Sequence, residues 1–319
     1  MEIYSHFFKE HIKIPYSVLI PACGALQYKT TSTGDSLKSV EINEANTYGQ
    51  KKSLKRSSFL TLLSLYALHA DENGTIYYMD PNFIAAKLGL TRRTVLKSLA
   101  ILKEQSYIDY IKSPYMPGCF DVLLFNYKKM FQKKEQGGTG YLELPKEDLL
   151  NIISLRSIDE VRIAIRSFHI TRNSSTSRMI PFNVVKCWVK HSRSKKTIVD
   201  FLNHSVDSMV SVKSEKKHIV FTKRYEYTAE YKRTLLSNYK HEVINFIKAM
   251  DKEYGPAPAV KLKDIKDISN IAFTYGIENL KSGIKEFYRT YIAESINYHK
   301  IGALIRNLTL QNCSNLSMN

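Results

Sequence analysis

Apolar residues recur at helical intervals in two neighbouring segments, 83–88 and 91–102, and this spacing predicts two short helices that each bury one face. Gly89 lies between them and suits the end of the first helix, while Thr91 suits the N-cap of the second. The predicted buried positions are Phe83, Ile84, Ala85 and Leu88 in the first helix, and Val95, Leu96, Leu99 and Leu102 in the second.

Alternating apolar residues follow these helices at 107–111 and 120–125, separated by a turn that contains Pro114, Pro117 and Gly118. The alternation predicts a strand hairpin. An amphipathic helix over 57–69 and a short strand over 75–79 precede the two helices.

This order resembles a winged helix, in which the second helix of the pair lies in the DNA major groove. The resemblance implies DNA contacts from the start of that helix. The residues expected there are Thr91, Arg92, Arg93, Lys97 and Ser98. A winged helix that binds only protein is the alternative.

Segment 141–227 predicts a candidate second winged helix. Helical patterns cover 146–153, 158–169, 181–189 and 193–203, and an alternating hairpin covers 210–221. The expected DNA contacts are Arg193, Lys195 and Lys196 at a helix start and Lys213, Lys216 and Lys217 on the hairpin. An unrelated mixed domain with a solvated basic face fits the same pattern.

The last segment, 228–319, predicts helices over 235–250, 265–275, 277–293 and 298–308. It resembles the helical domain of DnaD-like primosome proteins, through Tyr275, Gly276, Ile277, Leu280, Ile284, Phe287, Tyr298, Ile301, Leu304 and Ile305. It departs from that family at Leu308, where the family carries tryptophan. A generic helical docking or oligomerisation domain fits as well.

These segments predict an α+β chain that is mostly α. Residues 1–131 form an N-terminal arm and a winged helix, and 132–140 form a Gly-rich linker. The arm contains a strand-like stretch at 14–20. It ends in a basic cluster, Lys51, Lys52, Lys55 and Arg56, which suits either phosphate contact or a solvated helix entry.

The charge balance favours a polyanionic partner, because 47 Lys and Arg face 30 Asp and Glu for a net charge of +17 among 319 residues. Four widely spaced cysteines suit a reduced cytoplasmic protein. No apolar run approaches the ~20 residues of a membrane span. We therefore expect a cytoplasmic, nucleoid-associated protein without membrane contact.

Signs of catalysis are weak. The chain has no P-loop, no GxGxxG and no HExxH. Cys187 and His191 are irregularly placed for zinc. The segment 155–161 and the His169–Arg172 pair only faintly echo tyrosine recombinases, which leaves a non-catalytic relative that binds DNA as an alternative. We expect no enzyme activity, no metal and no cofactor.

The whole layout resembles plasmid and phage replication initiators of Gram-positive bacteria, some with two winged helices and others with a DnaD-like domain. The resemblance implies binding to repeated origin sites in double-stranded DNA and recruitment of host replication proteins. A homodimer is a further candidate assembly. A transcriptional regulator such as a phage repressor shares every feature and is the main alternative.

Overall fold

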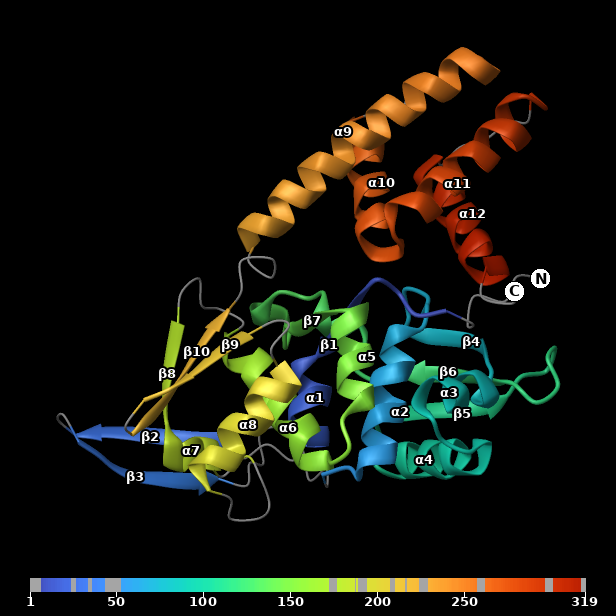
Figure 1. Cartoon of the computed structure of the whole chain (residues 1–319). Coiled ribbons are helices and arrows are strands. Elements are labelled where there is room, and N and C mark those ends of the chain that lie inside the picture. The colour runs from blue at the N-terminus through green and yellow to red at the C-terminus, as the bar shows by residue number, and fades with distance from the viewer. Residues whose placement is uncertain are drawn as a thin grey trace.

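The computed structural model describes residues 7–23, 27–33, 36–43, 53–171, 177–186, 188, 194–206, 210–215, 217–223, 229–256, 262–295 and 301–316. The described chain is a mixed α+β structure, mostly helical, with small antiparallel sheets (Figure 1). This agrees with the predicted fold class. Within these ranges, none of the helices combines the length and apolar content that a bilayer crossing requires.

The first half contains the β2–β3 hairpin and a three-stranded sheet. Its elements are β1 (His11–Pro15), α1 (Tyr16–Cys23), β2 (Gln27–Thr33), β3 (Ser36–Asn43), α2 (Arg56–Ala67), β4 (Thr75–Met79), α3 (Pro81–Leu88), α4 (Arg92–Glu104), β5 (Ile108–Lys112) and β6 (Phe120–Leu124). The sheet order is β4-β6-β5, and β2 pairs only with β3 as a hairpin. The predicted strand at 14–20 is wrong, because the chain turns into α1 directly after Pro15.

The second half repeats this order without the hairpin. Its elements are β7 (Tyr141–Pro145), α5 (Lys146–Ser154), α6 (Ile158–Thr171), β8 (Ser177–Pro181), α7 (Phe182–Lys186), α8 (Lys195–Val206), β9 (Val210–Ser214) and β10 (His218–Lys223). The sheet order is β8-β10-β9, which matches β4-β6-β5 strand for strand. Apart from the β2–β3 hairpin, the described elements of each half therefore follow the order strand, helix, helix, strand, helix, helix, strand, strand.

The two halves meet through their first strands. β1 pairs antiparallel with β7, and the register is symmetric about the pair Lys13↔Glu143. The sequences Ile-Lys-Ile-Pro at 12–15 and Leu-Glu-Leu-Pro at 142–145 occupy equivalent positions. In both strands the two apolar residues are buried, while the charged residue between them is only partly buried. Exchanging the two strands leaves this register unchanged, so a local two-fold axis relates them.

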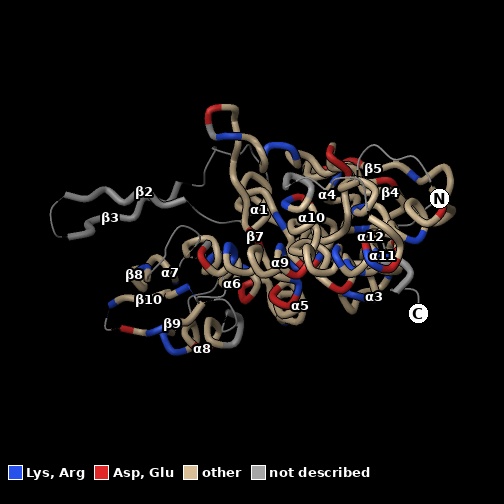
Figure 2. The backbone as a smooth tube through the Cα atoms, turned by 90° about the horizontal axis from the view of Figure 1, so that it is seen from above, with Lys and Arg blue, Asp and Glu red and all other residues tan. Residues whose placement is uncertain are grey.

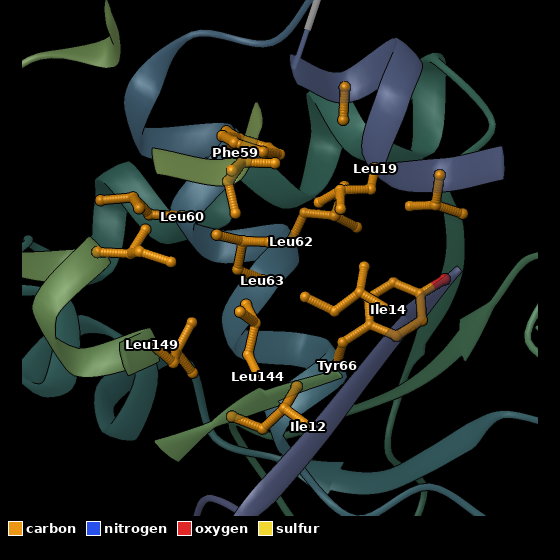
Figure 3. Packing of buried hydrophobic residues seen from close by; sticks show 14 of the residues in the cluster. Ile12, Ile14, Leu19, Phe59, Leu60, Leu62, Leu63, Tyr66, Leu144 and Leu149 are labelled. Carbon is orange, nitrogen blue, oxygen red and sulfur yellow. The ribbon is translucent and has the colours of Figure 1, made fainter. Parts of the chain in front are cut away.

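A single hydrophobic core spans both halves around this strand pair. Figure 3 shows Ile12 and Ile14 of β1 and Leu144 of β7 beside the apolar residues of α2. The helix α2 was expected to be amphipathic, but it is buried along nearly its whole length because β1, α4 and α5 surround it. Covering this helix therefore requires elements from both halves.

The Gly-rich stretch 132–140, which the composition predicts to be a linker, forms hydrogen bonds with its surroundings. The Gly138 N–H donates to the Lys133 carbonyl at 2.9 Å, and the Thr139 hydroxyl donates to Ser17 at 3.2 Å. A Cβ on Gly138 would lie 2.0 Å from the Gln132 carbonyl oxygen, so the fold of this turn needs glycine. The stretch delivers the chain directly into β7.

The C-terminal helices have a core of their own. They are α9 (Ala229–Tyr254), α10 (Leu262–Tyr275), α11 (Ile277–Phe287), a π-helical turn at Tyr288–Ile292 and α12 (Ile301–Leu316). The helices α11 and α12 cross closely at Gly283, where a Cβ would lie 2.4 Å from the Thr309 hydroxyl oxygen. The residues of the DnaD-like resemblance lie mainly in α11 and α12, with Tyr298 outside the described residues.

The helical block rests on the segment that leads into β1. The Glu10 N–H donates to the Thr274 carbonyl at 2.7 Å, and the His11 ring stacks on Phe273 at 3.6 Å between centroids. The Lys232 ammonium pairs with Glu143 of β7 at 2.7 Å. Burial lowers the pKa of His11 to about 4, so this ring is neutral at pH 7.

Candidate nucleic-acid interface

The pair α3 and α4 is built as its sequence predicts. Asp80 caps α3 by accepting from the Asn82 N–H at 2.8 Å, and Gly89 ends the helix in a left-handed conformation with φ 60°. Thr91 caps α4 and accepts from the Thr94 N–H at 3.2 Å. The turn is therefore fixed at both ends, and it sets the direction in which α4 begins.

The start of α8 has the same hydrogen-bonded cap as the start of α4. Ser194 accepts from the Thr197 N–H at 3.1 Å, and the two hydroxyls lie 2.8 Å apart. The corresponding hydroxyls of Thr91 and Thr94 lie 2.9 Å apart. The signal for this cap is the likeness of Thr-Arg-Arg-Thr at 91–94 to Ser-Lys-Lys-Thr at 194–197. The helix was predicted to start at Arg193, whereas α8 starts at Lys195 and Ser194 caps it.

Three of the five residues expected to contact DNA near the start of α4 are basic and exposed. Arg92, Arg93 and Lys97 are exposed near the start of α4, and Thr91 is the exposed cap. Ser98 is a correction, because it is only 1% exposed and cannot reach a groove. It lies three residues after Val95 and four before Leu102, so the helical repeat turns it inward with them.

The second half shows a comparable set. Lys196 on α8 and Lys213 and Lys217 on the β9–β10 hairpin are exposed. The predicted contacts Arg193 and Lys216 lie outside the described residues.

Each half ties its hairpin to the start of its last helix through one basic side chain. Arg92 donates to the carbonyl of Gly118 at 3.4 Å, and Lys195 donates to the carbonyl of Glu215. Arg92 and Lys195 hold equivalent positions, one residue after the caps Thr91 and Ser194. These two side chains link the hairpins to the helix starts, and the next residues, Arg93 and Lys196, are the equivalent exposed cations.

At the other end of α4 the positive charge is neutralised. Lys103 forms an ion pair with Asp109 of β5 at 2.5 Å, and its hydrogen bond lowers the pKa of that carboxyl group. The unpaired positive charge of α4 is therefore concentrated in its N-terminal half, where the helix dipole also favours an anion.

One member of the basic cluster at the start of α2, Arg56, is used inside the fold. Arg56 donates to the carbonyls of Leu155 at 2.8 Å and Ile153 at 3.0 Å, so it satisfies the C-terminal end of α5. This use corrects the expected DNA contact for Arg56. Lys55 is exposed, while Lys51 and Lys52 lie outside the described residues.

The helices α4 and α8 both lie in the part of the molecule away from α9–α12 (Figure 1), and the view from above places them on opposite sides of β7 (Figure 2). Figure 2 shows that Lys and Arg are spread over all parts of the described chain, with acidic residues between them. The two capped helix starts are thus distinguished by their repeated geometry more than by one dense basic patch.

No group of three or more His, Cys, Asp or Glu that could hold a metal ion occurs among the described residues. Cys187 and His191 lie outside them. Cys23, Cys119 and Cys313 are buried free thiols, and burial raises the pKa of Cys23 and Cys313 to about 11. These three thiols are therefore protonated at pH 7 and poorly suited to nucleophilic chemistry.

Comparisons of the chain with protein-family models, with curated proteins and with solved structures find no match.

Proposed function

We propose that this chain is a sequence-specific double-stranded DNA-binding protein whose two halves are each a winged helix. The observation that carries the proposal is the repeat itself. The same element order and the same sheet order occur twice, and each copy has a Ser/Thr-capped helix that starts with two basic residues. In a winged helix, this is the helix that enters the major groove.

Arg93 and Lys196 are the side chains best placed to meet base edges or phosphates, because they are exposed on the first turn of α4 and α8. Arginine at such a position suits bidentate contact with guanine. Since one chain carries both helices, a monomer would offer two helix starts to the major groove. A dimer would extend the site further.

The leading role is that of a plasmid or phage replication initiator. The C-terminal helices support this role because they form a separate core on the side opposite α4 and α8, where replication proteins could dock while DNA is bound. A transcriptional regulator remains the alternative. Short direct repeats in the bound DNA would favour an initiator, and an inverted repeat at a divergent promoter would favour a repressor.

The test is selection of bound fragments from genomic DNA, followed by footprinting at moderate salt. Arg93→Ala and Lys196→Ala should each weaken binding to the selected site by about tenfold or more, as expected for the loss of about 1–3 kcal/mol per base contact. Arg233→Ala and Lys266→Ala, which remove exposed cations from α9 and α10, are the matched controls. The proposal fails if the wild-type chain enriches no fragment, or if all four variants bind alike.

A further inference from the structure

The tip of the β5–β6 hairpin is an ordered loop with an apolar surface. The Ser113 N–H donates to the Cys119 carbonyl at 3.0 Å, and the Cys119 N–H donates to the Met116 carbonyl at 3.1 Å. Ser113 and Cys119 are buried at its base, and Gly118 takes a φ of +87° that favours glycine. The loop is therefore held from within and presents its outer residues in a fixed direction.

Tyr115 stands at this tip with 67% of its surface exposed, more than any other large hydrophobic side chain among the described residues. Pro114 and Pro117 on either side are also exposed. Segment 112–119 contains one lysine and no acidic residue. An aromatic ring held in solvent by two prolines is costly unless a partner covers it.

The tip is fixed relative to α4, because Arg92 at the start of that helix donates to the Gly118 carbonyl at 3.4 Å. A duplex that receives α4 in its major groove would therefore meet this tip at the same time. The corresponding tip of the second half differs in chemistry, since it exposes Lys213, Glu215 and Lys217. That tip suits phosphate contact, whereas the first suits an apolar contact.

We propose that the Tyr115 tip is a wedge that enters the minor groove beside the α4 site and kinks the duplex there. The inference rests on the proposed DNA binding and adds to it a bend made by only one of the two hairpins. Apolar side chains inserted at a base step unstack it and kink the DNA by about 20–90°. Pyrimidine–purine steps unstack most easily, so we expect such a step under the tip.

The experiment measures bend and affinity together, on circularly permuted fragments that carry the genomic site selected by the wild-type protein. When the wild-type protein is bound, the gel mobility of the complex should depend on the position of the site within the fragment. Tyr115→Ser should lose most of this dependence and bind about tenfold more weakly, as expected for one lost stacking contact. Tyr115→Phe should retain both. Tyr77→Ser is the matched control, because Tyr77 is also half-exposed but lies on β4 away from the tip.

Wild-type binding without bending overturns the wedge and leaves the proposed function standing. The wedge is also overturned if Tyr115→Ser binds and bends the DNA as the wild type does. That result would assign the exposed ring to a protein partner. Failure of the wild-type chain to select any DNA overturns the proposed function itself. Circular dichroism of each variant separates these outcomes from misfolding.

Discussion

Lys9 is a buried lysine whose removal should stabilise the protein. Its backbone N–H donates to the Ala67 carbonyl at the end of α2, and the residue is only 8% exposed. Its ammonium has no acidic partner among the described residues. Burial, and then the nearby charge of Lys13, lower the pKa of Lys9 from 10.5 to about 7.

This shift sets the magnitude. Lowering a lysine pKa from 10.5 to about 7 corresponds to about 5 kcal/mol of unfavourable free energy at pH 7 or below. Lys9→Met keeps most of the side-chain length and removes the charge. We expect the free energy of unfolding to rise by about 2–4 kcal/mol at pH 7, less than the full penalty because repacking around the new side chain is imperfect.

The pH dependence gives an independent check. Because the folded pKa lies below the unfolded pKa, the unfolded chain binds more protons between about pH 7 and 10.5, and wild-type stability rises with pH in that window. The slope contributed by this one group approaches about 1.4 kcal/mol per pH unit. Lys9→Met should lack this contribution.

Urea unfolding followed by circular dichroism, from about pH 7 to 8.5, measures both quantities. The upper limit keeps the thiols of the unfolded chain, whose ordinary pKa is 9.0, mostly protonated. Lys55→Met, at an exposed lysine, is the control and should change neither quantity. Equal stability of wild type and Lys9→Met, or an unchanged pH slope, would refute the reasoning.

Three further substitutions test the packing described above. Gly283→Ala should destabilise the C-terminal helices by about 1–3 kcal/mol, because its Cβ meets Thr309; hydrogen exchange in α11 and α12 should rise while α2 stays protected. Arg56→Met should lower the free energy of unfolding by about 1–3 kcal/mol through the two bonds lost to α5, and an unchanged urea midpoint would contradict that role. Ser194→Ala should cost about 1 kcal/mol as a lost N-cap, with hydrogen exchange in α8 as the readout and Ser194→Thr as the conservative control.

Local signals in the sequence predicted much of the first half. Gly89 and Thr91 predicted the turn between α3 and α4, and the alternating residues predicted β5 and β6, because these features depend on neighbours within a few residues. The inward face of Ser98 was also readable from its spacing to Val95. Residue type alone does not predict it, because serine is mostly exposed in proteins.

Features that depend on distant partners could not be predicted in this way. The pairing of β1 with β7 joins residues about 130 positions apart, and the use of Arg56 depends on the end of α5. The repeats Ile-Lys-Ile-Pro and Leu-Glu-Leu-Pro carried a signal for the pairing, but a four-residue likeness shows its meaning only when both strands are seen side by side. Apart from Ser98 and Arg56, the expected DNA contacts stay predictions, and Lys51, Lys52, Arg193 and Lys216 lie outside the described residues.

The pairing of β1 with β7 has a consequence for synthesis on the ribosome. β1 has no partner strand until residue 145 has left the exit tunnel, so the first half emerges with an open strand edge and an incompletely covered α2. At about 5–20 residues per second, that interval lasts on the order of ten seconds. An unpaired edge is a site for association with other chains. The delay between the synthesis of β1 and that of β7 is therefore a period of aggregation risk for this protein.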